Sequence, residues 1–448
     1  MKKTFHPQLI LLWLLGIAAM TAQKIEGLGV IHAISVIVWL TDFIYLTLTV
    51  KTKRQLLVTG ICFWIGSVIR TFGFMGIFAA DVLLVTVYSI PFFGALILNR
   101  FLAKRWKSFL TTLTVPALWA LMFLILSLIR IPSIIRFDFL WFDCKSLVQS
   151  VSYLSTTGFN FVTVWVAAVL AQGAANRKII LPAAAVLLGI VLIVAGRIQL
   201  AQKPEPCGTV RIGYSTGAYT GDFLDNHPIS YEECVASFRK VFNQAAAQNL
   251  DMLAFCEETY EIQDYQEKEF VEIIEKAAKE SGIYVLIGFD VKDTDNSEGG
   301  KALNKIILIG NDGNAVSEYA KYNVIPILED AYKPGDGTIP APVIDINGTA
   351  VKVAFAICYD SNFSHYIGKI PEDTQLFILP SWDWDGITYM HSRLCGNLAI
   401  ENRVSLLKPT YDGYTIAVDP YGNILDFKST KETGYENVQV IEMPIFEK

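Results

Sequence analysis

Seven apolar stretches, each about the length of a membrane-crossing helix, fill the first 202 residues of the chain. The hydrocarbon core of a bilayer is about 30 Å thick and needs roughly 20 apolar residues per helix. The stretches lie at residues 7–22, 28–50, 55–79, 82–99, 108–129, 151–172 and 178–197. We therefore predict a multi-span α-helical membrane domain of about seven transmembrane helices over residues 1–202, and a single soluble globule is excluded.

The first stretch has a second interpretation. It is short and follows Lys2 and Lys3, which is also the pattern of a secretory signal peptide. No small-x-small cleavage site with a soluble chain behind it follows, so a first membrane helix is the favoured interpretation.

The charge of the chain changes sign at the end of the apolar half. Residues 1–202 contain 17 Lys and Arg but only five Asp and Glu, whereas residues 203–448 contain 20 basic and 38 acidic residues. An acidic domain repels phosphate. This distribution argues against nucleic acid as a partner.

Basic residues concentrate in alternate connections between the predicted spans. They are Lys2 and Lys3, then Lys51, Lys53 and Arg54, then Arg100, Lys104, Arg105 and Lys107, then Arg177 and Lys178. The positive-inside rule places these connections and the N-terminus in the cytoplasm. After seven spans, the rest of the chain lies outside the cytoplasm. Residues 203–208 (Lys-Pro-Glu-Pro-Cys-Gly) are predicted to form a short stiff linker, and residues 209–448 an extracytoplasmic domain.

Two ionisable residues lie inside predicted spans, Asp42 and Arg70. At 1.5 Å per residue their depths differ by about 9 Å, so a direct ion pair between them is marginal. Arg70 lies closer to the outer face, where its side chain can reach lipid headgroups. The alternative is a structural polar contact within the helix bundle.

Beyond residue 208 the pattern changes to short apolar strands that alternate with helices. Strands are expected at 210–214, 252–255, 284–289, 304–310, 315–319, 351–357 and 376–379, and helices at 231–247 and 269–279. Two of these strands flank Asn-Asp-Gly, a strong hairpin signal. Alternation of this kind predicts an α/β layered domain.

Three reactive side chains follow three of these strands, namely Glu257, Lys321 and Cys358. Active groups in α/β folds tend to lie just past the C-terminal ends of strands. The carboxylate can deprotonate the thiol, the ammonium can stabilise an oxyanion, and the backbone N–H of Tyr359 can add a second oxyanion donor. The alternative is that none of the three is catalytic. Glu257 would then be an acid at a strand end, Lys321 a solvated lysine and Cys358 a small buried side chain.

The motifs around these residues resemble those of the nitrilase superfamily. They are Leu253-Ala-Phe-Cys-Glu-Glu-Thr259, Tyr319-Ala-Lys-Tyr-Asn-Val-Ile-Pro-Ile-Leu-Glu329 and Ala356-Ile-Cys-Tyr-Asp360, followed by His391, Ala399-Ile-Glu-Asn-Arg403 and Val418-Asp-Pro-Tyr-Gly422. A multi-span membrane half ahead of such a domain resembles the apolipoprotein N-acyltransferases over essentially the whole chain. This resemblance implies an αββα sandwich for residues 209–448.

The resemblance also implies roles for four side chains: Glu257 as general base, Lys321 as oxyanion stabiliser, Cys358 as nucleophile and Glu329 as a second acid near the site. Cys358 would take an acyl chain from a phospholipid as a thioester. The α-amino group of the diacylglyceryl-cysteine of a lipoprotein would then accept the chain. Such an enzyme works at the bacterial cytoplasmic (inner) membrane. No cofactor is expected, and the sequence shows neither metal-ligand spacing nor a phosphate-binding loop.

Three features depart from the family pattern. The doublet Glu257-Glu258 leaves two candidates for the base, of which Glu257 is favoured. The acid two residues past the nucleophile is Asp360 instead of glutamate. The family carries a further membrane span after its catalytic domain, and none follows up to Lys448, so a single covalent tether to the bilayer is expected.

Aromatic side chains offer candidate lipid contacts. Trp382, Trp384 and Tyr389 lie in one short segment and can line an acyl pocket or touch lipid, because Trp and Tyr favour the depth of the headgroups. The loop between the fifth and sixth spans contains Trp141, and this loop weakly resembles the corresponding loop of the acyltransferase family. Ordinary packing is the alternative for all of them.

Three other functions remain open. The first is a membrane-tethered nitrilase-like amidase, in which water hydrolyses the thioester. The second is an acyltransferase with a different amine acceptor. The third is an inactive scaffold that uses the fold for binding. The intact Glu257, Lys321 and Cys358 disfavour the scaffold. The membrane half disfavours the amidase, because a soluble amide needs only one anchor.

Cysteine oxidation limits the proposed chemistry. Six cysteines are expected outside the membrane, where disulfides can form. The nucleophile Cys358 must stay free, and its neighbour in the expected site, Cys256, must not capture it.

Overall fold

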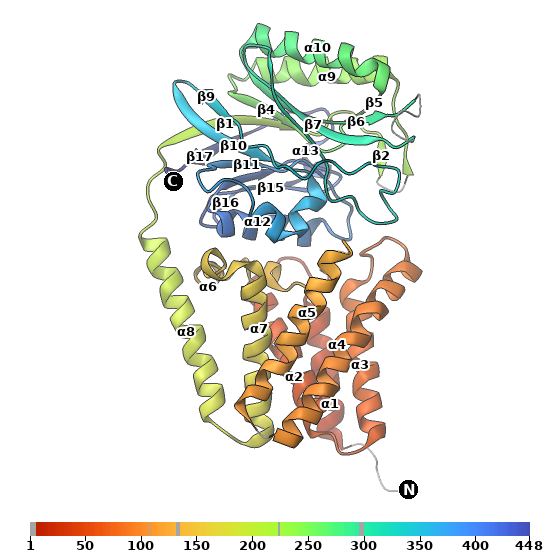
Figure 1. Cartoon of the computed structure of the whole chain (residues 1–448), viewed down its shortest axis with the longest axis vertical. Helices are drawn as coiled ribbons and strands as arrows, with labels where there is room; N and C mark the ends of the chain where they lie inside the picture. The colour runs from red at the N-terminus through yellow and green to blue at the C-terminus, as the bar shows by residue number, and fades with distance from the viewer. Residues whose placement is uncertain (1–5, 107, 131–134, 223–224, 295–299) are drawn as a thin grey trace. The chain divides into compact units, whose positions relative to one another are not determined.

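The computed structural model describes residues 6–106, 108–130, 135–222, 225–294 and 300–448. Its ribbon is shown in Figure 1. The chain divides into two compact units, Met1–Gln202 and Lys203–Lys448. The first unit is helical, and the second contains all of the β-strands described.

A helix occupies each of the apolar stretches predicted in the first unit. The main helices are α1 (Pro7–Ala22), α2 (Val30–Thr49), α3 (Lys53–Thr71), α4 (Phe78–Trp106), α5 (Thr114–Leu128), α7 (Val151–Asn176) and α8 (Ile180–Ala201). Three short helices join them: η1 (Phe109–Leu113), η2 (Asp138–Trp141) and α6 (Lys145–Val148).

Five helical segments among the described residues are long and apolar enough to cross a membrane. They are α2, α4, the continuous segment Phe109–Leu128, α7 and α8. Helix α1 is apolar but shorter, and α3 carries basic residues at both ends. These five segments indicate a multi-pass membrane protein, and seven crossings remain a prediction.

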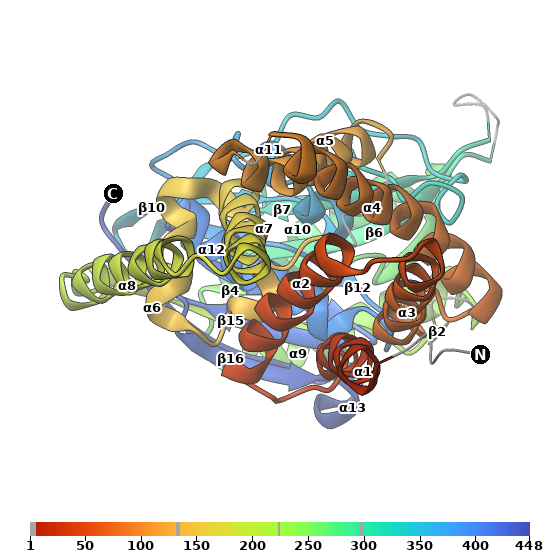
Figure 2. The ribbon, with the colours of Figure 1, turned by 90° about the horizontal axis from the view of Figure 1, so that it is seen from below.

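Helix α2 lies at the centre of the helical unit, between α1 and α7 (Figure 2). The Trp39 ring on α2 lies 6.1 Å from the rings of Phe63 on α3 and Phe92 on α4, and 5.7 Å from the ring of Phe137. Tilted and edge-on ring pairs at such distances add to the stabilisation from apolar burial. This aromatic cluster joins three helices and the connection before η2.

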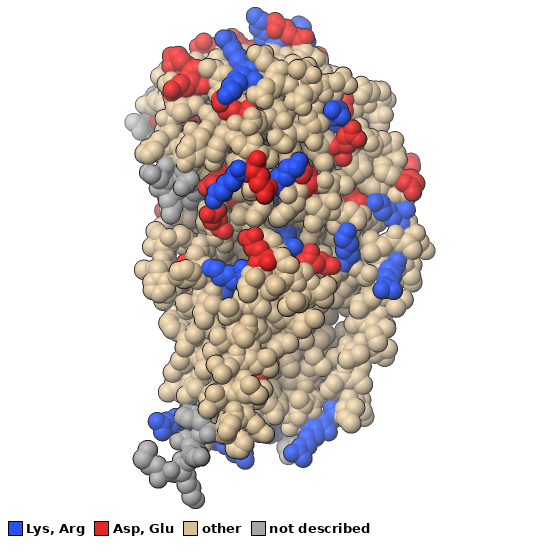
Figure 3. Space-filling model, turned by 180° about the vertical axis from the view of Figure 1, so that it is seen from behind, with Lys and Arg blue, Asp and Glu red and all other residues tan. Residues whose placement is uncertain are grey.

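Basic side chains gather at one end of the helical unit, and the belt beside them is nearly free of charge on the face seen in Figure 3. The connections α2–α3, α4–η1 and α7–α8 lie at the same end because successive helices run antiparallel. Lys51 and Arg177 lie in two of these connections, and Lys104 lies in the last turn of α4. An uncharged belt bounded by basic connections is the pattern of a membrane-spanning bundle.

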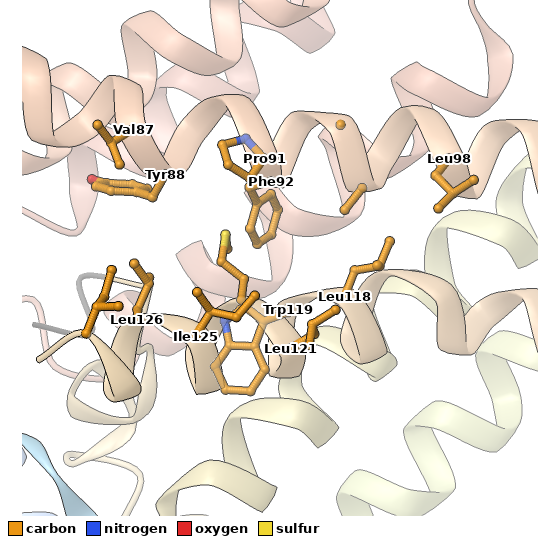
Figure 4. Close-up of a pocket in the computed structure, with 14 residues that line it drawn as sticks. Val87, Tyr88, Pro91, Phe92, Leu98, Leu118, Trp119, Leu121, Ile125 and Leu126 are labelled. Carbon is orange, nitrogen blue, oxygen red and sulfur yellow. The ribbon is translucent and has the colours of Figure 1, made fainter. Parts of the chain in front are cut away.

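An apolar groove of about 480 Å³ lies between α4 and α5. Its floor contains the buried rings of Phe92 and Trp119, and its rim contains the exposed side chains of Val87 and Leu121 (Figure 4). All of its lining residues are apolar or aromatic. This lining suits helices that are surrounded by hydrocarbon chains.

Gly196 is the position at which α8 approaches α6. A Cβ at residue 196 would lie 1.6 Å from the carbonyl oxygen of Ser146, whereas one at Gly189 on the same helix would meet no atom within 4 Å. We expect Gly196→Ala to lower the thermal unfolding midpoint of the purified chain. Gly189→Ala should leave it unchanged or raise it, because alanine favours helices more than glycine does. Equal midpoints for the two variants would contradict this packing.

The second unit is built on two mixed sheets. The first has the order β17 (Gln439–Ile445), β1 (Gly208–Ser215), β4 (Met252–Phe255), β6 (Tyr284–Lys292), β7 (Leu303–Ile309) and β8 (Ala315–Ala320), with β5 (Tyr260–Gln263) also paired to β6. The second has the order β16 (Ile424–Ser429), β15 (Tyr414–Val418), β13 (Ser405–Lys408), β11 (Leu376–Ile378), β10 (Thr349–Phe355) and β9 (Val343–Ile346). Two short pairs complete the strands: β2 (Gly221–Asp222) with β3 (Asp225–Asn226), and β12 (Ser381–Trp382) with β14 (Thr410–Tyr411).

Helices cover the sheets. Helices α9 (Tyr231–Ala246) and α10 (Asp264–Ser281) lie side by side on the first sheet (Figure 1), and α12 (Thr388–Asn402) packs on β13 and β15. The short helices are η3 (Cys358–Asn362), α11 (Ser364–Ile367) and α13 (Thr430–Thr433). On the apolar faces of α9 and α10, Phe238 packs against Phe255 of β4, and Phe270 packs against Phe238. The predicted fold class, a helical membrane region followed by a layered α/β domain, is confirmed.

The segment 203–208 is attached to the second unit by specific contacts. The Lys203 ammonium donates a hydrogen bond to Asp419 at 2.7 Å, and the Cys207 N–H donates to the carbonyl of Ile445 at 2.8 Å. Strand β1 begins at Gly208, where it pairs with β17. These contacts hold the end of the connection against the sheet.

Candidate active site

Strand direction brings two of the three predicted catalytic residues to one edge of the first sheet. Strands β4 and β6 are parallel, and β7 is antiparallel to both β6 and β8, so β4 and β8 run the same way. Glu257 follows the end of β4, and Lys321 follows the end of β8. Cys358 comes just after β10 of the second sheet.

Lys321 lies between two carboxylates. Its ammonium donates to Glu257 Oε1 at 2.7 Å and to Glu329 Oε1 at 2.5 Å, and all three side chains are buried. The N–H of Ile325 holds the other oxygen of Glu329 at 2.8 Å. Burial alone would lower the pKa of Lys321, but the two carboxylates raise it well above its usual value, so the lysine is a fixed cation.

The carboxylate of Glu257 accepts three hydrogen bonds. Besides Lys321, Asn304 Nδ2 donates to Oε1 at 2.8 Å, and the backbone N–H of Trp382 donates to Oε2 at 2.8 Å. The same Trp382 residue accepts from the Cys358 thiol through its carbonyl oxygen at 3.6 Å. The Trp382 peptide therefore links the candidate base to the candidate nucleophile.

The neighbouring acid Glu258 has different surroundings. It adopts a left-handed φ of 49° and accepts a hydrogen bond from Asn304 at 2.9 Å. Burial, followed by the nearby charges of Asp290 and Glu257, raises the pKa of Glu258 well above its usual range. These surroundings favour the neutral form of Glu258, while Glu257 pairs with Lys321.

Cys358 is the first residue of η3 and has a strained backbone conformation. Its φ is 38°, in the left-handed region that non-glycine residues rarely adopt, and its N–H donates to the carbonyl of Pro380 at 2.9 Å. The thiol is 4% exposed. Burial and the negative charge of Glu257 raise its pKa well above the usual value, with Lys321 acting in the opposite direction.

Asp360 ties this turn to the loop after β8. Its Oδ2 accepts from the N–H of Ile357 at 3.1 Å and from the Tyr319 hydroxyl at 2.7 Å, and its Oδ1 accepts from the N–H of Asn323 at 2.9 Å. The contacts place the segment carrying Cys358 next to the segment carrying Lys321. The shorter aspartate reaches all of these donors.

The other predicted residues of the second unit have varied positions. Tyr359 follows Cys358 and packs its buried ring against Phe363, with ring centroids 5.4 Å apart. Trp382 is buried and lies edge-on to Tyr411, with centroids 4.8 Å apart. Trp384 and Tyr389 are half-buried, and the guanidinium of Arg393 lies 4.5 Å from the centroid of the Tyr389 ring. The oxyanion and lipid-contact roles remain predictions.

Arg70 and Trp141 belong to the first unit. The Arg70 guanidinium lies over the ring of Phe137 at 5.4 Å. Trp141 in η2 lies edge-on to Phe159, with centroids 5.8 Å apart, and lines a cavity of about 500 Å³ with residues of α2, α6 and α8. The buried Oδ2 of Asp42 has no hydrogen-bond partner among the described residues.

All seven cysteines of the chain have free thiols in the structure. Cys256 is buried, and its thiol donates to the carbonyl oxygen of Ser215 at 3.5 Å. Burial raises the pKa of Cys256 well above the usual value, as it does that of Cys358, so position and not pKa distinguishes the two thiols. Cys358 has a free thiol and is available for chemistry.

Two sets of side chains in the described residues bring metal-ligand atoms within 4.8 Å of one another. One is Glu257, Glu258 and Glu329, and the other is Cys358, Asp383 and His391. The first set already surrounds the Lys321 ammonium, and Asp383 of the second accepts from the Lys408 ammonium at 2.6 Å. In each set a lysine ammonium already contacts a carboxylate.

Sequence reasoning missed several residues of this site. Asn304, Asp383 and Lys408 were not singled out, and His391 was quoted only as part of a motif. Lys408 is the last residue of β13. A strand predicted at Ser405–Lys408 would place Lys408 at a strand end, which is the signal that identifies Lys321 and Cys358.

The fold and this Glu–Lys–Cys arrangement define a nitrilase-like α/β domain. Residues 232–442 match the carbon-nitrogen hydrolase family. The matched segment lies within the second unit, which is similar to nitrilase-like domains.

Two curated proteins are similar to parts of the chain. Apolipoprotein N-acyltransferase 2 of Treponema pallidum (strain Nichols) is 25% identical over 167 residues, which are 32% of this chain and 30% of that protein. The hydrolase in agr operon of Staphylococcus lugdunensis is 26% identical over 141 residues, which are 29% of this chain and 59% of that protein. The match spans less than two thirds of either relative.

Solved structures are similar to the second unit at low identity. An amidase from Nesterenkonia sp. is 17% identical, with a TM-score of 0.42, and the match covers 53% of this chain and 90% of that one. A carbon-nitrogen hydrolase from Helicobacter pylori is 14% identical, with a TM-score of 0.42, and the match covers 53% of this chain and 89% of that one.

Proposed function

We propose that the protein is a membrane acyltransferase that moves an acyl chain from a phospholipid, through a thioester on Cys358, to the α-amino group of the diacylglyceryl-cysteine of a lipoprotein. The observation that carries the proposal is the buried contact of Glu257 with Lys321 beside Cys358, in a chain that also holds five apolar membrane-length helical segments. The partial similarity to an apolipoprotein N-acyltransferase supports the same reaction.

In the first half-reaction, the Glu257 carboxylate takes the proton of the Cys358 thiol. The thiolate attacks an ester carbonyl carbon of the phospholipid, and a tetrahedral oxyanion forms. The Lys321 ammonium stabilises this oxyanion, together with the backbone N–H of Tyr359. Collapse breaks the ester C–O bond, Glu257 returns the proton to the departing oxygen, and a lysophospholipid leaves.

In the second half-reaction, the acceptor amine attacks the thioester carbonyl. Glu257 takes a proton from the amine as the C–N bond forms. Collapse of the second oxyanion breaks the C–S bond, the thiol of Cys358 is restored, and the acylated lipoprotein leaves. Glu329 keeps Lys321 charged and in place throughout.

Both substrates are anchored in lipid, which is a physical reason to join the catalytic unit to a membrane bundle. We propose that the N-terminus lies in the cytoplasm and that residues 209–448 lie outside the cytoplasmic (inner) membrane of a bacterium. The basic alternate connections support this orientation. The proposed acyl or lipid contacts are Arg70, Trp141, Trp382, Trp384 and Tyr389.

A membrane-tethered hydrolase is the second candidate. The partial similarity to the hydrolase in agr operon favours it. The first half-reaction would use the same Glu257, Lys321 and Cys358, with an amide in place of the ester. Water would then resolve the thioester.

Incubation of the purified full chain with phospholipid that carries a labelled acyl chain tests the proposal. We expect label to accumulate on the protein in a bond that neutral hydroxylamine cleaves, as it does thioesters. A diacylated lipopeptide with a free α-amino group should then remove the label as an N-acyl product. Release of free fatty acid at the same rate with and without the lipopeptide would favour the hydrolase, and no labelled protein with any phospholipid would contradict the acyltransferase.

A further inference from the structure

A second cluster of buried charges lies beside Cys358, on elements of the second sheet. Asp383 follows β12, His391 lies on α12 and Lys408 ends β13. Asp383 and Lys408 are fully buried, and His391 is 3% exposed. The Cys358 sulfur, a carboxylate oxygen of Asp383 and a ring nitrogen of His391 all lie within 4.8 Å of one another.

Hydrogen bonds connect this cluster to the backbone of the nucleophile. The Lys408 ammonium donates to Asp383 Oδ2 at 2.6 Å, and Asp383 Oδ1 lies 2.7 Å from His391 Nδ1. His391 Nε2 lies 2.8 Å from the Ser361 hydroxyl. That hydroxyl donates to the carbonyl oxygen of Cys358 at 2.6 Å.

These partners determine the protonation of His391. The single hydrogen of the Ser361 hydroxyl is used on Cys358, so the hydroxyl oxygen accepts and Nε2 of His391 donates. Nδ1 also donates, because its partner is the carboxylate of Asp383. An imidazole that donates from both nitrogens is a cation. Burial alone would lower the pKa of His391, but the charge of Asp383 raises it to about 9.

The carboxylate of Asp383 is ionised as well. Burial would raise its pKa, but Lys408 and His391 lower it to about 2. Burial would likewise lower the pKa of Lys408, and Asp383 raises it. The cluster therefore holds two cations and one anion.

The charges around Lys321 have the opposite sum, because one cation there faces two anions. The ammonium there faces the carboxylates of Glu257 and Glu329. When Glu257 accepts the thiol proton, Lys321 is neutralised by Glu329, and the new thiolate has no excess positive charge on that side. An uncompensated charge in a buried site is costly.

We propose that Asp383, His391 and Lys408 form a net-cationic cluster that stabilises the thiolate of Cys358 and positions its turn through Ser361. The proposal rests on the assignment of Cys358 as the nucleophile. The proton moves from Sγ to Glu257, the hydrogen bond from Sγ to the Trp382 carbonyl is lost, and the sulfur anion lies beside the charged cluster. Asp383, His391 and Lys408 are positioning residues, since they act through Cys358.

Charged groups face the thiol from several elements. Glu257 after β4 and Asp383 after β12 raise the pKa of the thiol, whereas Lys321 after β8 and Lys408 of β13 lower it. The ring of His391 is itself faced by Asp383, Lys408 and the thiol of Cys395. Removal of a cation from the cluster changes the net charge around Cys358 and leaves Glu257 and Lys321 unaltered.

The pH profile of Cys358 alkylation by iodoacetamide, measured by peptide mapping of the full chain, tests the proposal without any substrate. We expect His391→Gln and Lys408→Met each to raise the apparent pKa of Cys358 and to slow its alkylation at neutral pH by about tenfold or more. His365→Gln is the matched control, because His365 is exposed on α11 and lies outside the cluster. The control should keep the wild-type profile.

A measurement on the wild-type chain removes the dependence on variants that fail to fold. The chain has five histidines, and an ordinary histidine, whose pKa is about 6.5, is neutral at about pH 8. In the ¹⁵N spectrum of histidine-labelled protein at about that pH, we expect one ring with both nitrogens protonated. A spectrum with only neutral rings overturns the proposal, as do folded His391→Gln and Lys408→Met variants with the wild-type alkylation profile. Because neither readout needs a lipid or an amine, failure of the acyltransferase proposal is detected separately.

Discussion

Cys358→Ala is expected to abolish both the labelled acyl-enzyme and the N-acylated product, whereas Cys256→Ala should leave both close to wild type. Loss of the nucleophile of a catalytic triad costs roughly 10⁶-fold in kcat. Cys358 lies in a strained turn beside Glu257 and Lys321. Cys256 instead donates its thiol hydrogen to the carbonyl oxygen of Ser215 within the core.

The comparison of these two cysteines controls for damage to the fold. Both side chains are buried, so each alanine removes one sulfur from a packed region of the same unit. Thermal unfolding of both variants should therefore change by similar small amounts, while intact-mass spectra separate them by the presence of the acyl group. An acylated Cys358→Ala protein would show that another residue carries the chain.

Glu257→Gln should slow acyl-enzyme formation by roughly 10²–10⁴-fold, which is the usual contribution of a general base. The amide keeps the shape of the side chain, and its oxygen can still accept a hydrogen bond, but it cannot take the thiol proton. Lys321 keeps its contact with Glu329, so the cation stays in place. Single-turnover measurements with labelled phospholipid give the rate directly.

Glu258→Gln is the matched control for this variant. Burial raises the pKa of Glu258 well above its usual range, which favours the neutral carboxyl group that glutamine closely imitates. We expect this variant to retain most of the wild-type rate. A larger loss with Glu258→Gln than with Glu257→Gln would assign the base to Glu258.

Much of the fold could be predicted because the signals are local. The apolar stretches correspond to helices α1 to α5, α7 and α8, and the hairpin at Asn-Asp-Gly joins β7 to β8. Rules for strand ends then placed Glu257, Lys321 and Cys358 where reactive groups tend to lie. These signals depend on hydrophobic periodicity and turn chemistry, which residues close in sequence determine.

The rest of the site depends on contacts between distant residues. His391 and Lys408 lie on α12 and β13, and nothing in the local sequence indicates that both reach Asp383. Asn304 opens a hairpin strand, yet its amide donates to Glu257. Strand pairing across two sheets creates these contacts, and spacing in the sequence does not encode them.

The sequence by itself determined that an apolar, basic half precedes an acidic α/β half, and it named the carboxylate, ammonium and thiol of the expected reaction. Tertiary structure decided which acid of the Glu257-Glu258 doublet faces Lys321, because a left-handed residue directly after Glu257 separates the two side chains. It also decided the charge around Cys358, because Asp383, His391 and Lys408 meet only when the second sheet forms. Burial makes those charges interact strongly, and burial is a property of the folded chain.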